Sequence, residues 1–513
     1  MVTRRQIVVV FSFVLLSLCS CGVLPQMMNQ VTLNGHTPQS HFFTRANTTY
    51  IIQQDIDLHG SQIIIPEGCM LNFAGGSIRN GSLKGDNTVV ELKGVGPVFH
   101  DVILSGSFTA KEFPINAYKT NKLDLFYSFL EAFSGTELYL TDDYGVTEYL
   151  GQSDGATPEC LHINGKGHKL TLFSFGVHKV NDCVIKDVTI EATQNITPKN
   201  NWKSDRFHFG VVGSIEHSAL KLQNVTFTKA TEFAYFRGFK NVEILNCKED
   251  GVYFFVYDCN NVSFHHNEIQ NASNGYYSIG RMTEKGYVKI FNNTFRNISG
   301  GGAILSGGLK YNVSICNNVF EKVGGGGAMK SCINIHPQGM VLVSNNRIVA
   351  NEGATTLDID AARSEYYSDA TTVTVRDNVI ENVSGDETVH GTALVGLAKL
   401  YVKNNTISNQ KFFFWDTPYM EFKGNTVTYT SDLGSSAEIG SMSAHETTEN
   451  KEYWHIYRNN VYNIPADKGS ARIRYQTKTP VRIVGKGNTY SGTVNFVDQY
   501  KKLDATGDIK IYK

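Results

Sequence analysis

One pattern of apolar and polar positions recurs through the second half of the chain. Each copy reads apolar-x-apolar, one or two polar residues, Asn, any residue, apolar. The copies, about 20 to 35 residues apart, carry Asn246, Asn267, Asn293, Asn318, Asn346, Asn378, Asn405, Asn425, Asn460 and Asn488. Repetition at such a period is typical of a solenoid built from one small structural unit.

The repeat predicts coils of short strands. Each copy is too short for two strands joined by a crossover helix, and alternating apolar positions indicate strands. Three short strands per coil, stacked about 4.8 Å apart from coil to coil, give a right-handed parallel β-helix. We expect each Asn to adopt left-handed backbone geometry at a bend and to bond the amides of the coils above and below.

The predicted fold class is therefore all-β, a single-stranded right-handed parallel β-helix with an N-terminal β subdomain and a capping helix. Looser strand patterns place N-terminal β coils at 46–115. A connecting region at 116–154 contains the amphipathic stretch LDLFYSFLEAF (123–133), which we expect to be a helix capping the open end of the main solenoid. The main β-helix is predicted at 155–490 and a last coil or cap at 491–513.

The N-terminus has the pattern of an export signal at 1–21. Two arginines precede an apolar run at 7–18 that is too short to span a bilayer. The run ends in Leu-Cys-Ser-Cys-Gly, which resembles a bacterial lipobox, with Cys21 as the acylated residue because it follows a small serine. Residues 22–45 would be a tether. The alternative is an ordinary secretory signal with two incidental cysteines.

These features predict an exported lipoprotein on the outer membrane or cell surface of a Gram-negative bacterium, held to the membrane by its lipid anchor. The net charge of −1 gives no basic excess, so nucleic acid is not an expected partner. The seven cysteines after Cys21 show no metal-ligand spacing, and we expect mostly buried free thiols. We expect a monomer.

The asparagine repeats, the helix at 123–133 and the stretch TELYLTDDYGV that follows it resemble the pectate-lyase-like superfamily of right-handed parallel β-helices. The resemblance is specific for fold. It does not define the function, because lyases, hydrolases, epimerases and passive tail proteins share this architecture. Exported members with lipoprotein signals often belong to systems that degrade polysaccharides. The resemblance also implies that the strand after each repeated Asn borders the substrate groove.

On that strand, the stretch GGGGAMKSCINIHPQGM (324–340) places Lys330, Cys332, Asn334 and His336 on one outward face. The next coil, TTLDIDAAR (355–363), puts Leu357 and Ile359 inward and presents two aspartates and an arginine beside them. The remaining candidates come from neighbouring coils, namely Tyr253, Tyr257, Tyr276, Arg281, Asp358, Asp360, Arg363, His390 and Trp415. Charged residues at the centre, aromatic residues at the ends and glycine runs between them indicate a cleft.

Eliminative cleavage of a uronate polysaccharide would use such a cleft. The uronate carboxylate must be neutralised, a base must remove the adjacent proton, and an acid must protonate the leaving oxygen. Lys330 or His336 is the candidate base, and Tyr276 is the candidate acid. Calcium is the candidate cofactor, held by Asn334, Asp358 and Asp360, although Arg or Lys could neutralise the carboxylate without metal.

The substrate carboxylates would then bind to Arg281 and Arg363, and the sugar rings to the aromatic residues and His390. This mix of residue types resembles the β-helical alginate and dermatan lyases, without a residue-by-residue match. The predicted function is a polysaccharide lyase that cleaves an acidic, uronate-containing polysaccharide, such as a glycosaminoglycan, by β-elimination.

Two other functions stay open at this point, and one of them is not enzymatic. A glycoside hydrolase on the same fold would need two or three carboxylates, for which Asp358 and Asp360 with Asp416 or Asp258 are available. The Asn-Thr-Asp, Asp-Asp and Gly-His-Gly set of polygalacturonase-like hydrolases is absent from the sequence. A surface glycan-binding protein or adhesin would use the aromatic residues for binding, with the charged residues only solvated or ion-paired.

Overall fold

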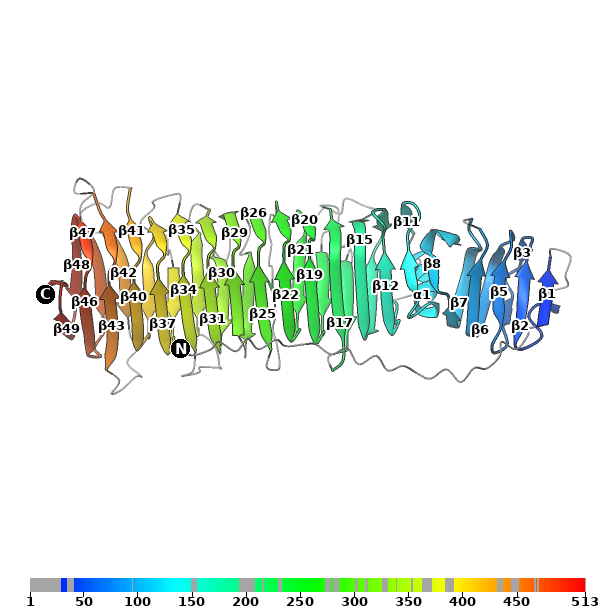
Figure 1. Cartoon of the computed structure of the whole chain (residues 1–513), viewed down its shortest axis with the longest axis horizontal. Coiled ribbons are helices and arrows are strands. Elements are labelled where there is room, and N and C mark those ends of the chain that lie inside the picture. Colours follow the sequence, from blue (N-terminus) through cyan, green and yellow to red (C-terminus); the bar gives the residue numbers. More distant parts are fainter. Residues whose placement is uncertain are drawn as a thin grey trace, which may run out of the picture.

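A computed structural model describes residues 29–34, 41–94, 96–148, 155–192, 208–214, 216–228, 233–272, 278–279, 286–299, 303–309, 312–324, 331–337, 339–351, 354–361, 371–382, 392–430, 437–443, 452–465, 467 and 470–512. The strands stack side by side along one long rod, with β1 at one end and β49 near the other (Figure 1). They form three parallel sheets.

The first sheet has eight strands and forms the N-terminal end of the rod. Its strands are β1 Asn29–Leu33, β2 Thr48–Ile52, β3 Ile56–Asp57, β4 Gln62–Ile64, β5 Met70–Phe73, β6 Ile78–Leu92, β7 Phe99–Thr109 and β9 Tyr118–Lys119.

The second sheet has 14 strands, one from each successive coil of the main solenoid. They are β14 Phe175–Val180, β16 His208–Gly213, β18 Phe233–Arg237, β21 Tyr253–Tyr257, β24 Ser278–Ile279, β27 Ile304–Leu309, β30 Ser331–Pro337, β33 Thr355–Asp360, β36 Thr392–Val395, β39 Phe412–Trp415, β42 Ala437–Ser443, β45 Ser470–Gln476, β48 Thr493–Asp498 and β50 Ile511–Tyr512.

The third sheet folds around a sharp bend, so each coil contributes a strand before it and a strand after it. The strands before the bend are β8 Glu112–Pro114, β10 Glu137–Tyr139, β12 Cys160–Asn164, β19 Asn241–Leu245, β22 Asn261–His265, β25 Tyr287–Phe291, β28 Asn312–Cys316, β31 Met340–Ser344, β34 Thr372–Arg376, β37 Lys399–Lys403, β40 Tyr419–Lys423, β43 Tyr453–Arg458, β46 Val481–Lys486 and β49 Leu503–Thr506.

The strands after the bend are β11 Tyr144–Val146, β13 Lys169–Leu172, β20 Lys248–Asp250, β23 Glu268–Gln270, β26 Thr294–Ile298, β29 Val319–Val323, β32 Arg347–Ala350, β35 Val379–Asn382, β38 Thr406–Ser408, β41 Thr426–Thr428, β44 Val461–Asn463 and β47 Thr489–Ser491. Two longer strands, β15 Asp182–Ala192 and β17 Ala219–Phe227, run through the bend.

The sequence predicted that one Asn at each bend both adopts left-handed backbone geometry and bonds to the neighbouring coils. In the structure two successive residues share these roles. The first residue takes the left-handed backbone, as Asn345 does with φ 56°, and the second forms the ladder. The main-chain N–H and the Nδ2 of Asn346 both donate to Oδ1 of Asn378 in the next coil, at 2.9 and 3.0 Å. Asn246 was assigned to the ladder wrongly, because it is the left-handed residue and Cys247 occupies the ladder position.

Apolar side chains fill the interior of each coil and stack on their equivalents in the next coil. The rings of Phe295 and Phe320, for example, lie parallel with centroids 4.8 Å apart. The seven described cysteines are free, and five of them are buried, as expected from their spacing. Within the described part of the chain, no helix is long and apolar enough to cross a membrane.

The helix α1 (Leu123–Ala132) lies where the first sheet meets the main solenoid (Figure 1). Phe129 stacks on Tyr118 of β9 at 4.6 Å and also contacts Phe113 of β8. A single-turn 3-10 helix, Ile115–Ala117, joins these two strands. The helix therefore buries its apolar face between two sets of coils.

Candidate functional site

The 14-stranded sheet brings four of the predicted side chains together on β30 and β33. Asn334 lies opposite Asp358, and its Nδ2 donates to Oδ2 of that carboxylate at 3.0 Å. Two residues further along the same strands come His336 and Asp360. Side chains two residues apart share one face of a strand. We call these four residues the β30–β33 cluster.

The register that produces this cluster follows from the alternation in both strands. Ile333 and Ile335 of β30, with Leu357 and Ile359 of β33, are fully buried and pair with each other across the sheet. The polar residues between them are thereby turned to the outer face. The inward positions predicted from the sequence for Leu357 and Ile359 are confirmed.

The hydrogen bond of His336 defines the tautomer of its ring. Nδ1 lies 3.0 Å from the main-chain oxygen of Asp360. A carbonyl oxygen can only accept, so Nδ1 carries the proton and donates it. In the neutral ring, Nε2 then holds the lone pair. His336 is half-buried, which leaves this nitrogen as the atom that can accept a proton.

The carboxylates of the cluster are withdrawn from water. Asp360 and Asn334 are each only 6% exposed, and Asp358 is half-buried. A charged group in such surroundings is stabilised by donors or by a cation rather than by bulk water. The cluster therefore places two carboxylates and an amide side by side at a position largely shielded from water.

Cys332 was expected on the same outward face, and this expectation is wrong. Its side chain is fully buried, and its thiol donates to the main-chain oxygen of Val323 in the preceding strand β29 at 2.9 Å. Burial raises the pKa of this thiol far above its ordinary range, so it is not a nucleophile. The position lies where the chain enters β30 from the corner of the coil, and strict alternation does not yet apply there.

Aromatic residues lie on the same sheet on both sides of the cluster. Trp415 in β39 is 37% exposed, and its ring meets Phe413 edge-on at 5.8 Å. It is two strands beyond Asp360 in the same row, roughly 10 Å at ordinary strand spacing. Tyr257 in β21 is half-buried, and Tyr253 begins the same strand.

Six of the predicted functional residues lie outside the described residues, and the roles assigned to them stay predictions. They are Cys21, Tyr276, Arg281, Lys330, Arg363 and His390.

Arg237 is a cation on this sheet that the sequence did not indicate. It lies opposite Tyr257, its guanidinium group is 5.4 Å from that ring, and Nη2 is 3.0 Å from Oδ2 of Asp258. Its strand, β18, precedes the first copy of the asparagine pattern, so the alignment of repeats did not reach it. Asp258 is engaged by this arginine, which makes it a poor candidate for a hydrolytic carboxylate.

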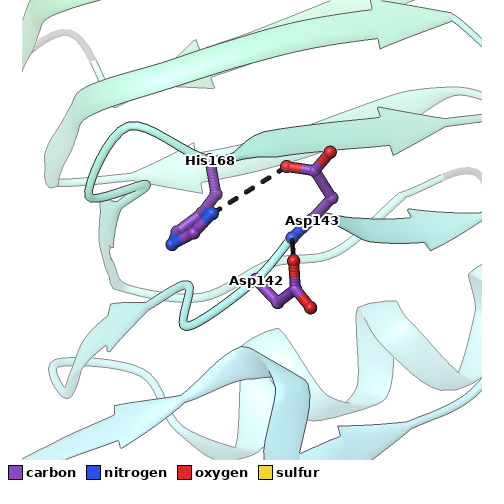
Figure 2. A group of neighbouring side chains, drawn as sticks. All are labelled: Asp142, Asp143 and His168. Carbon is purple, nitrogen blue, oxygen red and sulfur yellow. Dashed lines mark hydrogen bonds and ion pairs between the residues drawn. The ribbon is translucent and has the colours of Figure 1, made fainter.

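A second polar group, at the junction with the N-terminal coils, contains Asp142, Asp143 and His168 (Figure 2). Both aspartates are exposed. Oδ1 of Asp142 accepts the main-chain N–H of Asp143, and Oδ1 of Asp143 accepts that of Lys169, each at 2.8 Å. Aspartate side chains in turns commonly accept such hydrogen bonds from main-chain N–H groups. These hydrogen bonds therefore explain the position of the two aspartates without a metal ion.

A cavity of about 320 Å³ opens on other strands, β17, β20 and β23. Its walls include Thr226, Lys248, Glu249, Glu268 and Gln270. Glu249 is buried in line with the apolar interior residues Phe227 and Ile269. The cavity belongs to the third sheet and does not extend the β30–β33 cluster.

The arrangement of coils agrees with a comparison against known protein families. Residues 216–427 match the family model described as a right handed beta helix region. The coils of the main solenoid form a right-handed parallel β-helix. No curated protein matches it significantly in sequence. The β-helix fold is compatible with polysaccharide lyase activity, but it also hosts other functions, so the activity depends on the site rather than on the fold.

Proposed function

We propose that this β-helix protein is a polysaccharide lyase that cleaves an acidic, uronate-containing polysaccharide at the β30–β33 cluster. The observation that supports the proposal is the cluster itself. An amide, an imidazole with a defined lone pair and two largely buried carboxylates lie on one face of two neighbouring strands.

In β-elimination, a base removes the proton on the carbon next to the uronate carboxyl group. The electron pair forms a C=C bond, the glycosidic C–O bond breaks, and the leaving oxygen takes a proton. Nε2 of His336 is the base in this proposal, because the bond from Nδ1 to Asp360 orients the ring and leaves Nε2 basic. Lys330 is the second candidate base, with Tyr276 as the acid.

The carboxylate next to the reacting carbon must also be neutralised. Asp358, Asp360 and Asn334 are oxygen-bearing side chains of the kind that Ca²⁺ prefers, although they supply fewer than the six to eight oxygens it takes. A calcium ion held here would stabilise the negative charge that develops on the substrate. Arg281 and Arg363 would bind further carboxylates, while Tyr253, Tyr257, His390 and Trp415 would contact the sugar rings.

Export and lipid anchoring through Cys21 belong to the same proposal. A protein held at a cell surface by a flexible tether meets polysaccharide outside the cell, where a rod with an open sheet face can accept a long chain. Signal peptidase cleavage and acylation are tested by mass spectrometry of the mature N-terminus and by comparison with Cys21→Ser.

The experiment follows ultraviolet absorbance during incubation with glycosaminoglycans, alginate and pectins, with calcium and with chelator. Absorbance from the new C=C bond should rise, and His336→Gln should lower the rate by about 100-fold, the ordinary size of a general-base effect. Asp358→Asn should lower the rate and the heat of calcium binding together. The matched controls lie elsewhere on the rod: His162→Gln at a half-buried histidine and Asp504→Asn at an exposed aspartate.

Two other results would redirect the assignment. New reducing ends without absorbance would indicate a glycoside hydrolase. Binding of polysaccharide with neither product would indicate a glycan-binding protein. In either case the lyase proposal is wrong.

A further inference from the structure

Five basic residues form a single row along the third sheet, on the strands just before the bend. Arg376, Lys403, Lys423, Arg458 and Lys486 end β34, β37, β40, β43 and β46, and each pairs with the next across the sheet. Neighbouring strands are about 4.8 Å apart, so the row presents one cation per coil along the rod axis. We call these five residues the basic row.

The fold does not require a cation at this position. The five preceding coils carry in the same row, in order along the chain, Leu245, His265, Phe291, Cys316 and Ser344. In that half of the rod the row is neutral, and His265 stacks on Phe291 at 4.6 Å. Both halves form the same bend and the same ladder, so the change to five cations reflects chemistry rather than backbone geometry.

Like charges directly opposite each other on neighbouring strands destabilise a sheet. Part of the row is compensated, because Arg376 lies 2.7 Å from Asp377 and Lys403 lies 2.7 Å from Glu421. Lys423, Arg458 and Lys486 are exposed and form no ion pair with any other described residue. A run of cations kept at such a cost is suited to an anionic partner from outside.

Aromatic residues lie beside the row on the same strands. Lys403 lies over the ring of Tyr401 at 4.4 Å, and Tyr401 contacts Tyr419 at 5.8 Å. Trp454, opposite Tyr419, is 38% exposed and is covered in part by Arg482. Aromatic faces next to cations suit a ligand with both ring faces and negative charges.

We propose that the basic row binds an acidic polysaccharide lying along the rod, at a surface separate from the β30–β33 cluster. A sugar residue is about as long as the spacing between coils, so successive charged sugars can each reach a cation. The choice of ligand class rests on the proposed function. A row one cation wide on a protein of net charge −1 differs from the broad basic patch that binds nucleic acid.

The test compares two variants of the full chain that lose the same charge. One combines Lys423→Gln, Arg458→Gln and Lys486→Gln. The control combines Lys84→Gln, Lys119→Gln and Lys240→Gln, at exposed lysines that lie off the row and form no ion pair with other described residues. Dissociation constants are measured by calorimetry at low and at physiological salt for polygalacturonate, chondroitin sulfate, neutral dextran and single-stranded DNA.

We expect the row variant to bind at least one acidic polysaccharide about tenfold more weakly at low salt, since each exposed ion pair contributes a factor of about two. The control variant should bind like the natural chain, dextran should not bind, and salt should reduce the difference. Equal binding by the natural chain and the row variant, equal weakening in the control, or tighter binding of DNA than of polysaccharide would overturn the proposal.

His336→Gln separates this inference from the lyase proposal. It should retain the binding that depends on the row while losing cleavage. If no cleavage occurs in any variant but the row variant still binds more weakly, the binding surface stands and the lyase assignment fails. If cleavage occurs and binding does not depend on the row, the lyase assignment stands and the proposal for the basic row fails.

Discussion

At the scale of single residues, the bend is stabilised by a pair of neighbours with separate roles. The left-handed residue can be Asn, Asp, His or Gly, as Asn345, Asp377, His266 and Gly424 show. The following residue is buried and almost always Asn, because its side chain must accept two hydrogen bonds and donate two. The first position therefore tolerates change, and the second does not.

Asn346→Ala should lower the free energy of unfolding by about 2–4 kcal/mol, because it leaves buried partners unsatisfied on both sides. Asn318 donates to Oδ1 of Asn346 through its main-chain N–H and its Nδ2, and Asn346 donates to the oxygen of Ile315. Urea unfolding followed by circular dichroism measures the change. Asn345→Gly, at the exposed left-handed position, is the control and should change stability little; equal losses in both would contradict the division of roles.

Burial of His455 should lower the free energy of unfolding in mildly acidic solution. The ring is fully buried in β43, where Nε2 donates to the oxygen of Thr417 and Nδ1 accepts from the hydroxyl of Tyr475. Desolvation lowers its pKa to about 4, so the unfolded chain binds the proton more readily. Stability from this residue is full above pH 6.5 and falls by about 3 kcal/mol as the pH drops to 4.

Urea unfolding at several pH values between 7 and 4 measures the slope of the free energy of unfolding against pH. This slope should be smaller in His455→Phe. His162→Gln, at a half-buried histidine that pairs with Asp182, provides the comparison. An unchanged slope in His455→Phe would show that other groups dominate the acid response.

At the scale of elements, α1 is the one α-helix in the described part of the chain, and its role follows from its apolar face. Phe126, Phe129 and Leu130 are buried. Phe129 contacts Tyr118 of the first sheet, and Phe126 contacts Tyr144 of the main solenoid. A helix at this point covers strand ends that would otherwise expose their apolar interior. The helix should therefore stabilise both sets of coils.

Phe129→Ala should destabilise the junction by about 3–5 kcal/mol, the ordinary cost of removing a buried phenyl ring. Its ring is fully buried and lies 4.6 Å from Tyr118 and 5.2 Å from Phe133. Limited proteolysis should then cut near residues 110–148 at lower denaturant concentration. Leu125→Ala, on the half-buried side of the helix, should have a much smaller effect; equal sensitivity in both variants would mean that α1 does not depend on this packing.

The sequence predicted the coils because one side-chain pattern sets the whole fold. An Asn that must bond its equivalents recurs once per coil, and the apolar alternation around it defines which face is inside. Cys332 and Asn246 were placed wrongly because alternation and spacing fail by one residue at corners. The basic row is visible in the sequence two residues before each ladder Asn from Asn378 to Asn488, but the resemblance placed the predicted site on the strand after that Asn. The cluster at Asn334 and Asp358 was found because both lie in the middle of regular strands.

At the scale of the whole molecule, the rod behaves as a one-dimensional array. Each coil contacts mainly its neighbours, so the stability of one region depends weakly on distant ones. The two sets of charges also lie on different sheets. The basic row occupies the C-terminal coils of the third sheet, and the carboxylates of the cluster lie on the second sheet.

Phe295→Ala should reveal this local behaviour. The buried ring stacks on Phe320 at 4.8 Å, and its loss should cost about 3–5 kcal/mol. Hydrogen exchange measured by mass spectrometry should become faster in strands β22 to β29 and stay unchanged in β2 to β7. Phe99→Ala, at a buried ring of the first sheet, should give the opposite pattern.

Faster exchange along the whole chain in either variant would show that the rod unfolds as one cooperative unit. Exchange confined to the altered coils would mean that binding at the basic row and chemistry at the β30–β33 cluster can change independently, because little strain passes between them.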